Sequence, residues 1–146
     1  MSNKMRAGVI GVGAIGKNHA RIYSEIDTAE LVAVYDTDKE AAESMVSSYG
    51  GEVSNSIEEF IDLVDVVSIA TPTSTHRSIG ELLLNNNKHV LIEKPIADTT
   101  DDAQILVNLA AEKGCVLQVG HIERFNPVLG EIEERLKDPR FIEVHR

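Results

Sequence analysis

Residues 6–16 read Arg-Ala-Gly-Val-Ile-Gly-Val-Gly-Ala-Ile-Gly, an apolar run that leads into three glycines spaced as Gly-x-Gly-x-x-Gly. The run is typical of a buried strand at residues 6–12, and a helical pattern follows it over residues 15–26. Gly11 permits a tight turn, Gly13 lets a ligand approach the backbone, and Gly16 allows the helix to pack closely on the strand. The stretch therefore predicts a strand, a glycine loop and the N-terminus of a helix, in that order.

The remainder of the chain alternates strand and helix in the same way. Aliphatic runs predict further strands at residues 31–35, near Val53, and at 64–70, 89–92 and 116–119. Helical patterns lie at residues 38–49, 57–63, 73–85, 100–113 and 126–136, with capping boxes at Thr37 to Glu40 and Ser56 to Glu59. Such alternation predicts right-handed βαβ units, hence an α/β, Rossmann-type doubly wound parallel sheet in a single domain.

Domain limits follow from the same pattern. Residues 1–122 are expected to form one dinucleotide-binding Rossmann domain, because the glycine loop opens the series and the sixth strand closes it. Residues 123–146 are expected to contain a connecting helix and, at 141–144, the extended start of a further domain that is cut short. The further domain itself is then absent from these residues.

Composition excludes several classes of partner. The chain has 146 residues and a formal net charge of −10, which disfavours nucleic acid and anionic membranes. Its single cysteine, Cys115, excludes an intrachain disulfide, and the five histidines form no i, i+4 pair, so no metal site is predicted. No apolar run approaches the roughly 18 residues of a membrane span, and no secretory segment precedes the first strand. These features favour a cytoplasmic protein.

The glycine loop and the second strand together indicate a dinucleotide. Backbone N–H groups at Ala14, Ile15 and Gly16 would face a diphosphate at the helix N-terminus. Asp36 ends the second strand about 20 residues after the glycines, where a carboxylate accepts hydrogen bonds from ribose hydroxyls. Its charge disfavours a 2′-phosphate, so NAD is preferred over NADP, although Lys39 argues in the other direction. A purely structural turn with a capping aspartate, or a site for S-adenosylmethionine, remains open on these residues alone.

Four further motifs carry a family resemblance. They are Asp36, Ala-Thr-Pro-Thr-Ser-Thr-His at residues 70–76, Glu-Lys-Pro at 93–95, and Gly-His-Ile-Glu-Arg-Phe-Asn-Pro at 120–127. With the glycine loop, they resemble the glucose-fructose oxidoreductase/inositol dehydrogenase/rhizopine-catabolism (Gfo/Idh/MocA) family over essentially the whole chain. The octapeptide is most similar to a branch that acts on UDP-N-acetylglucosamine-type substrates.

The resemblance implies an NAD(P)-dependent oxidoreductase that acts on a hydroxyl group of a sugar, nucleotide-sugar or cyclitol. It also implies a second α/β domain, which supplies an Asp and a His to the active site and through which full-length members form homo-oligomers. The fragment alone is therefore expected to bind cofactor without turnover. Two other functions compete with this one, a non-catalytic dinucleotide sensor and a transferase that uses S-adenosylmethionine.

Lys94 is the candidate catalytic residue. It follows the fifth strand at the carboxyl edge of the sheet, where ligands bind in open α/β folds. An ammonium group there can donate a hydrogen bond to a substrate hydroxyl and stabilise the developing alkoxide. Glu93 and Lys94 are also expected to contact the cofactor. The neighbours Glu93 and Pro95, the latter with an expected cis peptide bond, distinguish Lys94 from an ordinary surface lysine.

Two other loops are expected at the same edge. The resemblance implies that Thr71, Pro72, Thr73 and His76 contact the cofactor. Thr73 or Ser74 could instead cap the following helix, and His76 is expected to support the loop rather than to exchange protons.

Three residues after the sixth strand are candidate substrate ligands, namely His121, Arg124 and Asn126. The planar fork of Arg124 suits a substrate oxygen or a diphosphate. On a solvated face, Arg124 could equally pair with Glu123 or Asp138.

Overall fold

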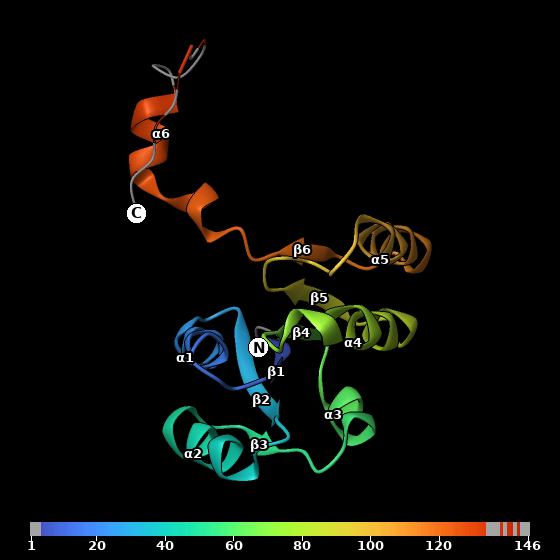
Figure 1. Ribbon diagram of the computed structural model, residues 1–146. Coiled ribbons are helices and arrows are strands. Elements are labelled where there is room, and N and C mark those ends of the chain that lie inside the picture. Colours follow the sequence, from blue (N-terminus) through green and yellow to red (C-terminus); the bar gives the residue numbers. More distant parts are fainter. Residues whose placement is uncertain (1–3, 134–137, 139, 142, 144–146) are drawn as a thin grey trace.

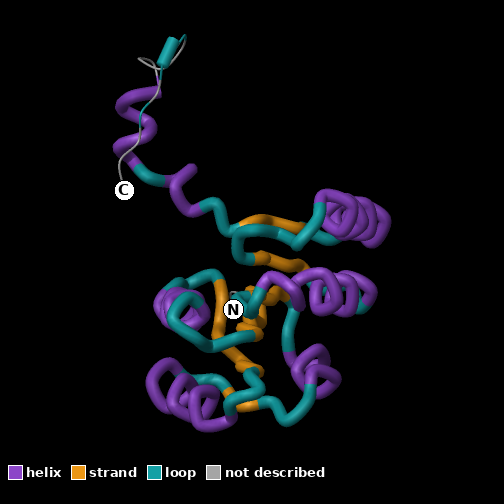
Figure 2. The backbone as a smooth tube through the Cα atoms, viewed as in Figure 1, coloured by secondary structure: helices purple, strands orange, loops and turns teal. Residues whose placement is uncertain are grey.

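The computed structural model describes residues 4–133, 138, 140, 141 and 143, and it contains a six-stranded parallel sheet flanked by helices on both faces (Figures 1 and 2). The strand order is β3-β2-β1-β4-β5-β6. The strands are β1 (Met5–Ile10), β2 (Ala29–Tyr35), β3 (Glu52–Val53), β4 (Val66–Ile69), β5 (His89–Ile92) and β6 (Leu117–Val119). The predicted Rossmann-type α/β fold is confirmed. Because the order reverses between β1 and β4, a crevice opens at the carboxyl ends of these two strands.

Five helices cover the two faces of the sheet. On one side lie α1 (Gly16–Glu25) and α2 (Lys39–Tyr49), and on the other lie α3 (Ile57–Leu63), α4 (Thr73–Asn85) and α5 (Thr100–Lys113) (Figure 1). Each face buries an aliphatic core, one around Val9 and Met45 and the other around Phe60 and Leu83. Gly8 in β1 leaves the space that the Phe60 ring occupies. The two cores explain why the strands have so few polar residues.

Helix starts agree with the predicted capping boxes in one case and not in the other. Ser56 Oγ accepts a hydrogen bond from the Glu59 amide at 3.1 Å, as predicted, whereas the Glu59 carboxylate accepts from the Asn55 amide at 3.1 Å rather than from the Ser56 amide. The box at Thr37 is wrong by one residue, because Asp38 is the N-cap of α2 and accepts from the Ala41 amide at 3.1 Å. A carboxylate at this position satisfies a free amide and also faces the positive end of the helix dipole.

After β6 the chain leaves the sheet. A short 3-10 helix, η1 (Ile122–Phe125), precedes α6 (Pro127–Glu133), and both extend away from the sheet in Figure 1. The predicted helix at 126–136 is present in its first part, whereas residues 134–137 lie outside the described residues. Of the predicted extended segment at 141–144, only 141 and 143 are described, and neither belongs to a strand. Among the described residues, none of the helices has the length and apolar character of a membrane span.

An ion pair at the amino-terminal edge of the sheet joins β1 to the residue that precedes β4. Arg6 Nη2 donates to Asp65 Oδ1 at 2.6 Å, and Arg6 Nε donates to Asp65 Oδ2 at 3.1 Å. The hydrogen bond from Arg6 holds the pKa of the Asp65 carboxyl below its ordinary value of 3.8. A carboxyl with a lowered folded-state pKa contributes stability above its unfolded-state pKa and loses that stability as the pH falls through the folded-state pKa.

Asp65→Asn is therefore expected to lower Tm by about 1–3 °C near pH 6, which is modest because the pair is half exposed. The difference from the wild type should shrink as the pH is lowered below 3.8. Thermal unfolding followed by circular dichroism over this range checks it. Asp98→Asn, which removes an exposed carboxylate without a hydrogen-bond partner among the described residues, is the control. A difference that stays constant with pH would contradict this assignment.

Candidate functional site

The glycine loop has the geometry that its spacing predicts. Gly11 adopts a φ of +84°, and a Cβ atom there would lie 2.8 Å from the backbone of Ala70. A Cβ at Gly16 would overlap the carbonyl oxygen of Gly11, so only glycine allows α1 to begin this close to β1. Gly13 differs from both, because a Cβ there would meet no protein atom within 4 Å. The loop therefore combines a tight turn, a close helix start and an open backbone surface.

Asp36 lies at the end of β2 and is fixed against this loop. Its Oδ2 accepts a hydrogen bond from the Val12 amide at 2.7 Å, and its Oδ1 accepts from the Asp38 amide at 2.9 Å. Each carboxylate oxygen can accept more than one hydrogen bond, so capacity remains for a ligand. The carboxylate is thus held in place by backbone groups on two sides.

A cavity of about 440 Å³ lies between the carboxyl ends of β1, β2 and β4. The predicted site residues that line it are Gly11, Gly13, Asp36, Thr71 and Pro72. Tyr35 and Ile79, which sequence reasoning did not single out, add apolar surface on two sides. A largely apolar space with one carboxylate at its edge fits the adenosine part of a dinucleotide, and the open backbone at Gly13 fits its diphosphate.

The loop between β4 and α4 borders this cavity. The Thr75 hydroxyl lies 2.8 Å from Thr71 Oγ1 and 2.8 Å from the Pro72 carbonyl oxygen. Pro72 is the N-cap of α4, and no side chain makes a capping hydrogen bond there. The alternative that Thr73 or Ser74 caps the helix is therefore wrong, because Thr75 holds the loop instead.

His76 lies behind the loop and is 1% exposed. Its Nδ1 is 2.9 Å from the Pro95 carbonyl oxygen, and its Nε2 is 2.9 Å from the Thr71 carbonyl oxygen. With both ring nitrogens directed at backbone carbonyls, the side chain connects the loop after β4 to the loop after β5. This placement suits the expected supporting role and leaves no ring surface for contact with a cofactor.

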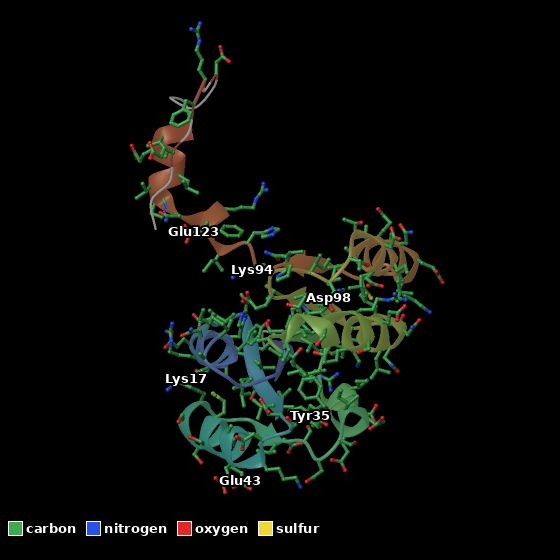
Figure 3. The ribbon with its side chains drawn as sticks, in the orientation of Figure 1. Lys17, Tyr35, Glu43, Lys94, Asp98 and Glu123 are labelled. Atoms are coloured by element: carbon green, nitrogen blue, oxygen red, sulfur yellow. The ribbon has the colours of Figure 1, made fainter. Side chains whose placement is uncertain are left out.

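Lys94 is exposed just beyond β5, at the same edge of the sheet (Figure 3). The Lys94–Pro95 peptide bond is cis, as the sequence predicted. The neighbouring Glu93 is half-buried, and its Oε1 lies 2.9 Å from Nε2 of His19 in α1. The sequence analysis did not identify this contact, which spans 74 positions of the chain.

The residues after β6 are less closely held. His121 and Arg124 are exposed, whereas Asn126 Oδ1 accepts from the Val128 amide at 3.0 Å and its Nδ2 donates to Glu123 at 3.0 Å. Asn126 therefore shapes the start of α6. Within the described part of the chain, Arg124 forms no ion pair with a carboxylate.

Metal ligands do not gather anywhere in the described segments. No group of three His, Cys, Asp or Glu side chains there has the geometry to hold an ion. The site thus consists of a glycine loop, a fixed carboxylate, an apolar cavity and an exposed lysine at one edge of a parallel sheet.

The chain is similar to proteins of one oxidoreductase family. Residues 5–121 match the family described as "Oxidoreductase family, NAD-binding Rossmann fold", GFO_IDH_MocA. The chain is 37% identical over 143 residues to UDP-N-acetylglucosamine 3-dehydrogenase from Acidithiobacillus ferrooxidans, covering 97% of this chain and 45% of that protein. It is 35% identical over 142 residues to inositol 2-dehydrogenase from Rhizobium meliloti, covering 96% of this chain and 43% of that protein.

Solved structures agree with these sequence matches. The Acidithiobacillus ferrooxidans enzyme superimposes with a TM-score of 0.85, covering 90% of this chain and 43% of that one. GenD2 from gentamicin A biosynthesis, solved in complex with NAD, is 27% identical with a TM-score of 0.78, covering 89% of this chain and 40% of that one. The chain spans less than half the length of these relatives. It belongs to the Gfo/Idh/MocA oxidoreductase family, and it is the NAD-binding Rossmann domain of that family.

Proposed function

We propose that this chain forms the cofactor-binding part of a dehydrogenase that transfers hydride between NAD and a hydroxyl group of a sugar, nucleotide-sugar or cyclitol. The observation that carries the proposal is the Asp36 carboxylate, fixed by the Val12 amide beside an open glycine loop. The two relatives named as UDP-N-acetylglucosamine and inositol dehydrogenases support the substrate class.

The residues around the cavity would hold the dinucleotide. Backbone N–H groups of Ala14, Ile15 and Gly16 have no partner within the first turn of the helix and would bind the diphosphate, with the dipole of α1 behind them. Asp36 would accept hydrogen bonds from the adenosine ribose and repel the 2′-phosphate of NADP, so we expect NAD to be preferred. Bound NAD supplies a nicotinamide ring that takes up or releases hydride.

Residues on the nicotinamide side would orient the ring and the substrate. Thr71, Pro72 and Thr73 would border the cofactor where it leaves the cavity, because Thr71 and Pro72 line the cavity at the carboxyl end of β4, the strand next to β5. Lys94 would donate a hydrogen bond to the substrate hydroxyl and stabilise its negative charge as the proton leaves. A purely regulatory dinucleotide sensor would not require this lysine.

The segment after β6 would face the substrate. His121 and Arg124 are exposed near the carboxyl edge, and Asn126 orders the backbone between them and α6. Residues 123–146 would connect the Rossmann domain to a second domain that completes the pocket, and such a full-length protein would be a homo-oligomer. The composition supports a cytoplasmic location and disfavours nucleic acid and membrane as partners.

Titration of the chain with NADH, NADPH and S-adenosylmethionine tests the proposal. We expect saturable binding of NADH, seen as a change in NADH fluorescence, and about tenfold weaker binding of NADPH, which corresponds to about 1.4 kcal/mol of repulsion between the Asp36 carboxylate and the 2′-phosphate. No turnover of sugars or cyclitols is expected from these residues alone. Saturable S-adenosylmethionine binding without an NADH response would refute the dehydrogenase assignment.

A further inference from the structure

The Glu93 carboxylate lies where three elements meet. Its Oε1 is 2.9 Å from His19 Nε2 in α1, and its Oε2 accepts from the Lys94 amide at 3.3 Å. The His19 and Glu93 side chains are only 17% and 14% exposed. Because water is largely excluded from this pair, the hydrogen bond between them is stronger than a surface ion pair.

Gly120 provides the third side. A Cβ atom at this residue, directly after β6, would lie 2.7 Å from Glu93 Oε1 and 3.0 Å from the carboxyl carbon. Any other residue at this position would displace the carboxylate from His19. A glycine is therefore needed at position 120 because it leaves space for the Glu93 carboxylate, and not because of a positive φ angle.

The contact joins the two ends of the proposed cofactor site. His19 lies one turn into α1, the helix whose N-terminus carries the diphosphate-facing N–H groups, and Lys94 follows β5 on the nicotinamide side. In the sheet, β4 lies between β5 and β1, and β1 is the strand that leads into α1. The side-chain contact thus joins α1 to the residue that follows β5, a strand two positions away from β1 in the sheet.

We propose that Glu93 is a positioning residue. The His19 side chain and the space left by Gly120 hold its carboxylate, and the carboxylate in turn fixes the position of α1, the phosphate-binding helix, relative to the turn that carries Lys94. This inference rests on the proposed function, because the Glu93 contacts are proposed to make the NAD-binding site rigid. It assigns Glu93 a role through its neighbours and not through contact with the cofactor.

Four variants of the chain test this role. Glu93→Gln and Gly120→Ala are each expected to weaken NADH binding about 10- to 100-fold, which corresponds to one hydrogen bond to a charged group. Both should also move the backbone amide NMR signals of Gly13 and Ala14, which touch neither substituted residue. In a Glu93→Ala background, Gly120→Ala should have no further effect, because no carboxylate remains to be displaced.

A matched control removes a carboxylate from α1, the helix that contains His19. Glu25→Gln breaks the exposed pair with Arg21 at the far end of α1, and it should change neither NADH affinity nor the glycine-loop signals. The inference is overturned if Glu93→Gln changes only signals of β5 and β6, or if the effects of Gly120→Ala persist without Glu93. Failure of the wild-type chain to bind NADH would refute the proposed function instead, and the amide signals would still test the coupling.

Discussion

Gly16→Ala is expected to abolish NADH binding and to destabilise the domain. The added methyl group would overlap the Gly11 carbonyl oxygen, so α1 must move away from β1. Overpacking at a contact with rigid backbone lowers the free energy of unfolding by about 3 kcal/mol. Displacement of the helix start also removes at least two hydrogen bonds to the diphosphate, so NADH affinity should fall by more than about 100-fold. Urea unfolding and NADH titration measure the two effects.

Gly13→Ala is the matched control for this experiment. A Cβ at Gly13 meets no protein atom within 4 Å, so the free energy of unfolding should change by less than about 0.5 kcal/mol. NADH affinity should nevertheless fall strongly, because the methyl group occupies the space through which the diphosphate reaches the backbone. Normal NADH binding by Gly13→Ala would show that the diphosphate lies elsewhere.

Asp36→Ala is expected to produce the second large loss of NADH affinity. The carboxylate is expected to accept hydrogen bonds from the ribose, and it also holds the Val12 amide at 2.7 Å. Loss of both interactions should weaken NADH binding about 50- to 100-fold, at about 1.5–3 kcal/mol for hydrogen bonds to a charged group. NADPH binding should be weakened less, since the repulsion of the 2′-phosphate disappears at the same time. The ratio of the two dissociation constants is the measurement.

Asp38→Ala separates this effect from a general loss of negative charge. Asp38 caps α2 through the Ala41 amide, so its removal should lower stability by about 1 kcal/mol. It is not expected to change the preference for NADH over NADPH. Equal effects of the two substitutions on that preference would contradict the role given to Asp36.

Sequence patterns predicted the sheet and its helices because each strand is a local aliphatic run and each helix has a local period. Boundaries were less certain, as the fourth strand illustrates. The apolar run covers residues 64–70, whereas β4 contains only Val66–Ile69. Val64 is the C-cap of α3 and is buried, so its apolar side chain packs in the core although the residue is not part of the strand. An apolar run predicts which side chains are buried, whereas the backbone hydrogen bonds to the neighbouring strands decide where a strand begins and ends.

The site was predictable where a motif is local and was missed where partners are distant. Gly11 to Gly16 and Asp36 could be placed from spacing alone. The sequence could not predict the contacts that Glu93 makes with His19 and with Gly120, because no local pattern links positions so far apart in the chain. A histidine one turn after the glycine loop is the only signal that could have suggested an acidic partner.

The crevice also sets the moment at which this domain can recognise NAD during its synthesis. The glycine loop leaves the ribosome early, but β1 is completed on its other side by β4, through pairs from Ala7 with Val66 to Ile10 with Ile69. Thr71 and Pro72, which form a wall of the cavity, come later still. A nascent chain that has exposed only its glycine loop therefore lacks the other wall of the adenosine cavity, and NAD can assist folding only after the residues through Pro72 have left the ribosome.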